Sequence, residues 1–319
     1  MTLQELARHS IALHVYSKDT EDTILRVARL FEERSGVTQL EDIGPESLLR
    51  FKTKTLNNAK TVTFNGYLGY LKLLGNFAEE ESFVAESPFR KQRAAPKSRP
   101  TPKVVSDTTF ADAIRHLTLN YERYDPAWFW KTVIRTIYYT GIRRRQLVSL
   151  QMKDLDFSSK TLRASIRGSK TRREWDVPLH PALIPTLKLL IHKSQTALAR
   201  PLRPDDYLFV VQRFNHRYAL NKDNPGQMKR EQVSGFFKRL STQIKGSIGA
   251  HRLRHTTATT LCNPSEGRAD VFAAQDLLGH VELSTTRIYV RSDMHRMRKA
   301  VNQLTEPGLR QKLDKRRIE

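Results

Sequence analysis

The segment His251-Arg252-Leu253-Arg254-His255-Thr256 places two imidazoles and two guanidiniums close together in the chain. On a helix, His251, Arg254 and His255 occupy positions i, i+3 and i+4, so they share one face. An imidazole and a guanidinium can therefore converge there on one anion. A metal ion is the weaker interpretation, because Arg254 would repel the cation and no acid or thiolate is evident as a third ligand.

Two further polar segments lie on either side of this helix in the sequence. In Thr140-Gly141-Ile142-Arg143 the glycine lets the chain turn from one helix into another, and the arginine follows the turn. In Leu277-Leu278-Gly279-His280 a histidine follows a helix-ending glycine, and Tyr289 comes shortly after. Taken singly, these residues are more typical of an exposed arginine, a capping histidine and a half-buried core tyrosine than of a reactive site.

The middle of the chain changes from helical spacing to an alternation with period two. Apolar residues alternate with polar ones in two runs, 162–166 and 175–179, joined by a polar loop at 167–173. This pattern predicts a β-hairpin with Lys170 at a cationic tip, and a third strand near 155–157. A solvated turn lysine is the ordinary alternative for Lys170.

Helical spacing dominates the rest of the chain. The first ninety residues predict short helices, with apolar stripes at 24–31 and 64–71. The segment 91–106 that follows is rich in proline and in basic residues, which predicts an extended linker between two domains. Its cations could track a phosphate backbone, or they could simply keep a connector solvated.

Composition indicates the class of partner. The 319 residues suit two domains, and the net charge of +22 favours nucleic acid or an anionic membrane surface. No run of about 18 apolar residues exists and residues 1–10 lack the layout of a signal peptide, so no membrane association is expected. Cys262 is the only cysteine, which excludes an intrachain disulfide and favours a reducing cytoplasm.

The ordered segments together resemble the tyrosine recombinase family, also called phage-type integrases, over essentially the whole chain. The matching patterns are Thr-Gly-x-Arg, a Gly-x-Lys-x-Arg hairpin, His-x-Leu-Arg-His-Thr, Leu-Leu-Gly-His and a following Tyr. The resemblance implies that the residues around the scissile phosphate are Arg143, Lys170, His251, Arg254 and His280. It implies that Tyr289 is the nucleophile.

The implied activity is site-specific DNA recombination through a 3′-phosphotyrosine, with no metal, ATP or other cofactor. Arg143 and Arg254 would stabilise the non-bridging oxygens, and His251 would accept the proton of Tyr289 or hold the phosphate. His280 would donate a further hydrogen bond. Lys170 would protonate the leaving 5′ oxygen as the general acid.

The implied fold is mainly α with a small antiparallel β-sheet. Residues 1–90 would form a helical core-binding (SAM-like) DNA-binding domain, followed by the linker 91–106. Residues 107–319 would form the tyrosine-recombinase catalytic domain, with an exchange tail at 294–319. Because the helical domain would begin almost at Met1, the extra amino-terminal arm-binding domain of larger integrases is expected to be missing.

The implied partner is double-stranded DNA with specific recombination sites, bound by a homotetramer on two duplexes. Groove contacts are expected around Thr53–Lys60 and Gln227–Lys238, and accessory DNA-bending proteins remain open. The expected setting is the nucleoid in a bacterial cytoplasm, with the gene on a mobile genetic element. The alternatives are a type IB topoisomerase-like or telomere-resolving enzyme and a non-catalytic DNA-binding relative.

The sequence departs from the family pattern in two places. Gln146 stands where an acid usually follows the first arginine, so Arg143 needs either a substitute acid such as Asp154 or a neutral hydrogen bond. The loop 262–269 is also a few residues longer than usual. Both departures leave room for altered regulation.

Overall fold

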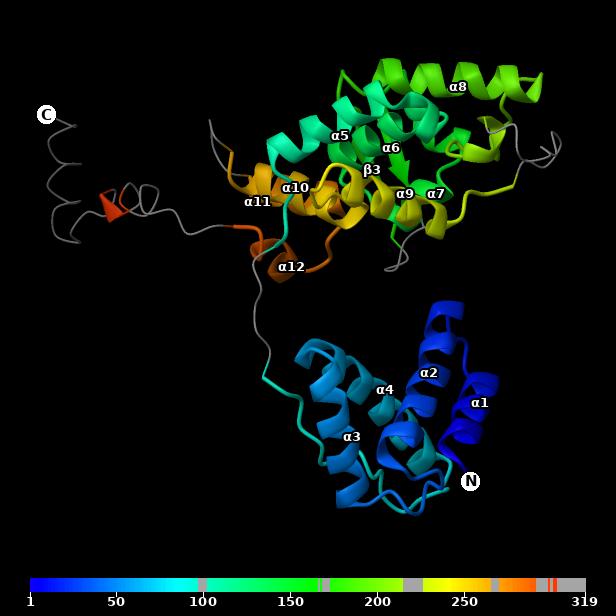
Figure 1. Cartoon of the computed structure of the whole chain (residues 1–319), viewed down its shortest axis with the longest axis vertical. Helices are drawn as coiled ribbons and strands as arrows, with labels where there is room; N and C mark the ends of the chain where they lie inside the picture. Colours follow the sequence, from blue (N-terminus) through cyan, green and yellow to red (C-terminus); the bar gives the residue numbers. More distant parts are fainter. Residues whose placement is uncertain are drawn as a thin grey trace, which may run out of the picture. The chain divides into compact units, whose positions relative to one another are not determined.

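The chain forms two compact units, Met1–Pro100 and Thr101–Glu319 (Figure 1). The computed structural model describes residues 1–96, 102–165, 167, 173–214, 226–264, 270–290, 298 and 301–302. Several expectations fall outside these ranges: Lys170, residues 97–101 of the predicted linker, residues 265–269 of the long loop, and nearly all of the predicted tail. Within the described ranges, no helix is long and apolar enough to cross a membrane.

The first unit contains the helices α1 (Leu3–Leu13), α2 (Lys18–Ser35), α3 (Pro45–Asn58) and α4 (Thr61–Glu80). Ser17 begins α2 by accepting the backbone N–H of Thr20, and Gly36 ends it in the left-handed conformation. The stripe predicted at 24–31 is fully buried, and that at 64–71 supplies Phe64, Leu68 and Leu71 to the same core. The helical period therefore identified the core faces of both helices.

The second unit is larger and carries most of the elements. Its helices are α5 (Asp107–Leu119), α6 (Ala127–Thr140), α7 (Arg144–Ser149), α8 (Ile184–Leu198), α9 (Arg230–Gln243), α10 (Ala250–Cys262), α11 (Val271–Leu278) and α12 (Leu283–Arg287). Short 3₁₀ turns occur at η1 (Tyr121–Tyr124), η2 (Met152–Asp154) and η4 (Val211–Phe214). The strands are β1 (Leu155–Asp156), β2 (Thr161–Ala164) and β3 (Trp175–Pro178).

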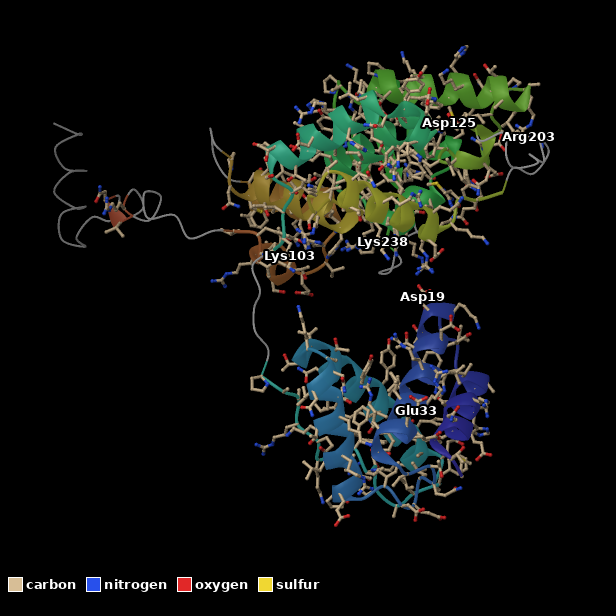
Figure 2. The ribbon with its side chains drawn as sticks, in the orientation of Figure 1. Asp19, Glu33, Lys103, Asp125, Arg203 and Lys238 are labelled. Carbon is tan, nitrogen blue, oxygen red and sulfur yellow. The ribbon has the colours of Figure 1, made fainter. Side chains whose placement is uncertain are left out.

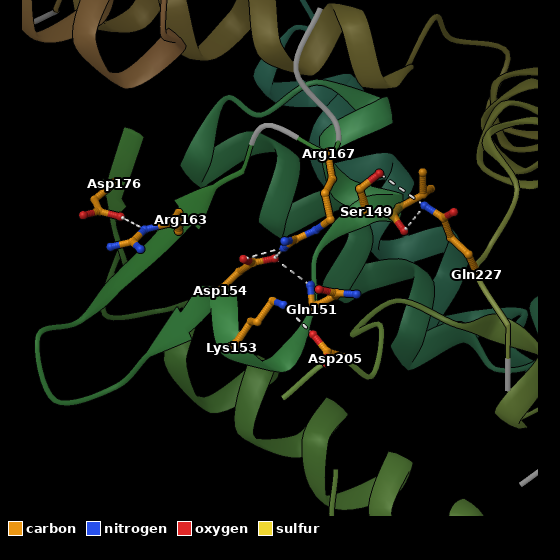
Figure 3. Close-up of polar contacts among 10 residues, drawn as sticks. Ser149, Gln151, Lys153, Asp154, Arg163, Arg167, Asp176, Asp205 and Gln227 are labelled. Atoms are coloured by element: carbon orange, nitrogen blue, oxygen red, sulfur yellow. Dashed lines mark hydrogen bonds and ion pairs between the residues drawn. The ribbon is translucent and has the colours of Figure 1, made fainter. Parts of the chain in front are cut away.

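The sheet has the antiparallel order β1-β2-β3, with Leu162 opposite Val177. Leu162 and Val177 are buried, whereas the neighbouring pair Arg163 and Asp176 forms an exposed ion pair at 3.0 Å (Figure 3). This alternation is what a strand with one buried face requires. The predicted hairpin and the third strand are both confirmed, as is the mainly helical fold class.

Helices α6 and α10 pack against each other at the centre of the second unit (Figure 1). The hydroxyl of Thr257 on α10 donates to the carbonyl of Tyr138 on α6. The core beside them is aromatic, with the rings of Trp130 and Phe236 stacked at 4.2 Å. The helix that carries the His-x-Leu-Arg-His segment is thus fixed along its length, which gives its polar first turns a defined position.

Candidate active site

Arg143 owes its position to the end of α6. The helix stops at Gly141, which has φ = +62°, and Arg143 is the N-cap residue of α7. A Cβ atom at position 141 would lie 2.8 Å from Cδ2 of Leu278. Both the backbone conformation and this close approach require glycine here.

Gln146 holds the backbone of Arg143 and not its side chain. Its Oε1 accepts the backbone N–H of Arg143 at 2.9 Å and so caps α7. Nη1 of Arg143 is buried and has no hydrogen-bond partner in the described part of the chain. The neutral hydrogen bond left open by the sequence is therefore the one that forms, and it leaves the guanidinium free for an anion.

Asp154 has a different partner from the one expected. Its carboxylate accepts Nη2 of Arg167 at 2.6 Å and the backbone N–H of Gln151 at 2.8 Å (Figure 3). Asp154 therefore does not substitute for the missing acid beside Arg143. Its ion pair fixes the stem of the β2–β3 hairpin at Arg167, which lies three residues before Lys170 in the sequence.

Arg254 joins three of the sequence segments. It is 3% exposed. Nη1 donates to the carbonyl of Gly141, and Nη2 donates to the carbonyl of Leu278 at 2.8 Å. The side chain of Arg254 thus satisfies a carbonyl at the end of α6 and another at the end of α11.

His280 contacts the same guanidinium. Its Nε2 lies 3.0 Å from Nη2 of Arg254, and its Nδ1 lies 2.8 Å from Oγ1 of Thr286. A guanidinium has donors only, so Nε2 must accept, and the proton of a neutral ring then sits on Nδ1 and is donated to Thr286. In this arrangement His280 orients Arg254.

Tyr289 is buried just after α12, with only 4% of its surface exposed. Its ring belongs to a small apolar cluster with Ala258, Cys262 and Leu278. The core interpretation of this tyrosine is therefore correct for its ring. Its hydroxyl is polar and faces elsewhere, because it lies 2.7 Å from Nδ1 of His255.

His255 is the site residue to which the sequence assigned no role. Its position one turn after His251 was visible, but its contact with Tyr289 depends on how the chain returns after α11. The rings of His251 and His255 meet edge to face at 4.0 Å. Among the described residues, His251 makes no hydrogen bond with Tyr289, and no group of three or more His, Cys, Asp or Glu could hold a metal ion.

A cleft of about 880 Å³ lies over these groups and is strongly basic. Five of the six predicted site residues line it, and Lys170 lies outside the described residues. The other basic residues along its described lining are Arg144, Arg145, Arg230, Lys238 and Arg252. No carboxylate belongs to that lining, so the cleft favours a polyanion. Lys238 is labelled on α9 in Figure 2.

The pKa values in the cleft follow from burial among cations. Burial lowers the pKa of Arg254 to about 9, which leaves it protonated at neutral pH. Burial and the neighbouring histidine and arginines lower the pKa of His255 to about 4, and burial with Arg254 and Arg143 does the same for His280. Burial raises the pKa of Tyr289, against the opposing effect of Arg254 and Arg143. The phenol and both imidazoles are therefore neutral at rest.

Comparisons with known proteins agree with this geometry. Residues 111–296 match the model of the phage integrase family. A putative tyrosine recombinase XerC of Pseudomonas aeruginosa is 28% identical, covering 93% of this chain and 70% of that protein. The tyrosine recombinase XerC of Bacillus subtilis is 25% identical over 92% of this chain and 88% of that protein.

Solved structures share the fold. The Tn1549 transposon integrase in complex with circular intermediate DNA superposes with a TM-score of 0.68 at 18% identity, covering 95% of this chain and 100% of that one. The XerH site-specific recombinase bound to its difH substrate gives 0.69 at 18% identity, covering 95% and 84%. With the family match over more than half of its length, the chain belongs to the phage integrase family, the tyrosine recombinases.

Proposed function

We propose that the chain is a site-specific DNA recombinase in which Tyr289 attacks a phosphodiester held by Arg143 and Arg254. The observation that carries this proposal is a buried phenol that belongs to the lining of a cleft rich in cations and, in its described part, free of carboxylates. A core tyrosine without a chemical role would have no need of such surroundings.

The two arginines supply the electrostatic stabilisation. Phosphodiester cleavage adds negative charge to the non-bridging oxygens, and fixed donors that are already in place stabilise that charge. Arg143 offers the buried Nη1 that has no partner among the described residues. Arg254 gives both Nη2 protons to Leu278 and His280 and one Nη1 proton to Gly141, so it offers its remaining N–H groups.

His280 acts through Arg254 in the described arrangement. Its Nε2 is the acceptor of that arginine, so it cannot donate to a phosphate at the same time. Direct donation would require the ring proton to move from Nδ1 to Nε2 and the contact with Arg254 to break. Lys170 keeps the expected role of general acid toward the 5′ oxygen, on a hairpin whose stem is held by Arg167 and Asp154.

The remaining assignments follow from family membership and charge. Residues 1–90 serve as the core-binding domain, 91–106 as the basic linker, and 294–319 as the tail exchanged between subunits of a homotetramer on two duplexes. Residues around Thr53–Lys60 and Gln227–Lys238 contact the grooves. A cytoplasmic protein of a mobile element, bound to the nucleoid, fits a chain with a net charge of +22.

The test is recovery of covalent protein–DNA complexes under denaturing conditions. The wild-type chain is incubated with fragmented DNA of its host, and the DNA attached to it is sequenced. A recombinase yields fragments that share one site, and Tyr289→Phe yields none. Fragments without a common sequence, together with relaxation of any supercoiled plasmid, would favour a topoisomerase instead. No adduct from the wild-type chain would favour a non-catalytic relative.

A further inference from the structure

We propose that His255, and not His251, accepts the proton of Tyr289 during strand cleavage and returns it during rejoining. The inference rests on the proposed function and adds a catalytic residue to it. It is carried by the one hydrogen bond that the nucleophilic hydroxyl makes within the described residues, 2.7 Å to Nδ1 of His255.

The contact has the geometry of a proton transfer. A distance of 2.7 Å between the phenolic oxygen and an imidazole nitrogen lies within hydrogen-bond reach for general base catalysis. The backbone at Tyr289 is held as well, because Asn263 donates its Nδ2 to the carbonyl of Tyr289 at 2.7 Å. The hydroxyl of Tyr289 and Nδ1 of His255 are therefore already in contact before DNA binds.

The protonation states suit this direction of transfer. The low pKa of His255 leaves its imidazole neutral, so Nδ1 can accept from the hydroxyl while Nε2 carries the ring proton. The raised pKa of Tyr289 keeps the phenol protonated until substrate arrives. The resting site thus holds a neutral acid beside a neutral base.

DNA binding strengthens the base. Burial, and after it the nearby His251, Arg254 and Arg252, disfavour a second proton on the ring of His255. A phosphodiester that occupies the cleft brings negative charge among these groups and offsets that repulsion. The imidazolium that forms at His255 is then stabilised by the phosphate, so transfer is favoured only when substrate is bound.

His251 lies on the other side of the same cluster. The cations that lower its pKa, after burial, are Arg254 and Arg143, the two arginines assigned to the phosphate. His251 is the more exposed of the two residues, and its ring contacts the ring of His255 edge to face. This placement suits a phosphate contact for His251, which was one of the two roles expected for it.

Each bond that forms during cleavage is matched by one that breaks. The Tyr289 oxygen forms a bond to phosphorus as its proton moves to Nδ1 of His255. The bond from phosphorus to O5′ breaks, and the leaving oxygen takes its proton from the general acid, expected to be Lys170. Rejoining reverses each movement, so the imidazolium protonates the departing phenolate.

The test measures single-turnover cleavage of a nicked suicide duplex that carries the site recovered from covalent complexes. In His255→Phe a planar aromatic ring is kept and the base is lost, so cleavage should slow by about 10²-fold or more. Replacing Tyr289 with a difluorinated tyrosine, whose phenol is more acidic, should restore most of the lost rate. His192→Phe, which changes an exposed histidine of α8 in the same unit, is the matched control and should cleave at the wild-type rate.

A second experiment tests whether His255 assists the nucleophile or the leaving group. A duplex with sulfur in place of the bridging 5′ oxygen has a leaving group that needs no proton. The defect of His255→Phe should persist on this duplex, whereas a residue that assists the leaving group would be rescued by it. Rescue by sulfur, wild-type cleavage by His255→Phe, or an equal defect with the fluorinated tyrosine would each overturn the assignment. Failure of the wild-type chain to cleave would instead overturn the proposed function.

Discussion

Trp175 on β3 donates its indole N–H to the carbonyl of Leu277, at 3.0 Å, across 102 residues of sequence. The ring also covers Gly279, so that a Cβ atom there would lie 2.5 Å from Trp175. The β2–β3 hairpin and the turn that presents His280 are thereby held together. Arg254 satisfies the next carbonyl, that of Leu278, so two side chains share the end of α11.

Gly279→Ala should impair both folding and cleavage. The position has φ = +60°, where a Cβ costs about 1–2 kcal/mol, and the contact with Trp175 adds to this and displaces His280. Gly226→Ala is the matched control, because position 226 has φ = +71° and a Cβ atom there would meet no atom of the described residues within 4 Å. Urea unfolding and suicide-duplex cleavage should show a larger loss of stability in Gly279→Ala, and a loss of cleavage in that variant alone. Equal effects of the two substitutions would show that the contact with Trp175 does not matter.

Gln146→Ala should loosen Arg143. It removes the side-chain oxygen that accepts the backbone N–H of Arg143, and the loss of this hydrogen bond costs about 0.5–1.5 kcal/mol of stability. The backbone that carries the guanidinium is then less firmly positioned, so cleavage should fall more than DNA affinity does. Gln146→Glu keeps an acceptor at the same place and should retain the cap. Chemical denaturation, with binding and cleavage assays side by side, distinguishes these outcomes, and wild-type cleavage by Gln146→Ala would contradict the role.

Asp154→Asn should affect the leaving-group side of the reaction. Removing the charge of a buried carboxylate leaves Arg167 without its ion pair at the stem of the hairpin that carries Lys170. We expect slower cleavage of a normal duplex and near-normal cleavage of one with sulfur at the bridging 5′ position. Asp176→Asn breaks the exposed pair with Arg163 on the same hairpin and serves as the control, with little expected effect. A defect that sulfur does not relieve would place the role of Asp154 elsewhere.

The second unit should lose stability in mild acid. Burial first, and then neighbouring cations, lower the folded-state pKa values of His255 and His280 from 6.5 to about 4. The folded state therefore prefers the neutral rings, so their stabilisation is complete above pH 6.5 and is lost as the pH falls toward about 4. The double variant His255→Gln, His280→Gln should show a flatter fall in the free energy of unfolding across this window. An unchanged slope would contradict the assignment, and His192→Gln provides the control.

The helical segments and the hairpin could be predicted because each depends on local periodicity and turn residues. The stripe at 24–31 and the alternation at 162 and 164 both became core. The contact between His255 and Tyr289 could not be predicted in this way, because the two residues lie 34 apart and meet only after α11 and α12 have folded back. The partner of Asp154 was missed for a related reason. A buried acid pairs with whichever cation the sheet brings to it, and that cation was Arg167.

The local sequence also could not decide whether a single residue has a structural role or a chemical one. Tyr289 is both a core residue, by its ring, and the candidate nucleophile, by its hydroxyl. Arg254 likewise closes two helix ends while it faces the cleft. Only the three-dimensional contacts reveal such double roles, because the local pattern is the same for either.

We expect Tyr289 to become covalently attached to DNA within a site built from arginines and histidines. The most direct measurement is mass spectrometry of the nuclease-treated adduct, formed in the presence of EDTA, together with end analysis of the released strand. We expect a phosphonucleotide on the peptide that contains Tyr289 and a free 5′-hydroxyl on the released strand. Modification of a different residue, or a released strand that ends in a 5′-phosphate, would contradict the account.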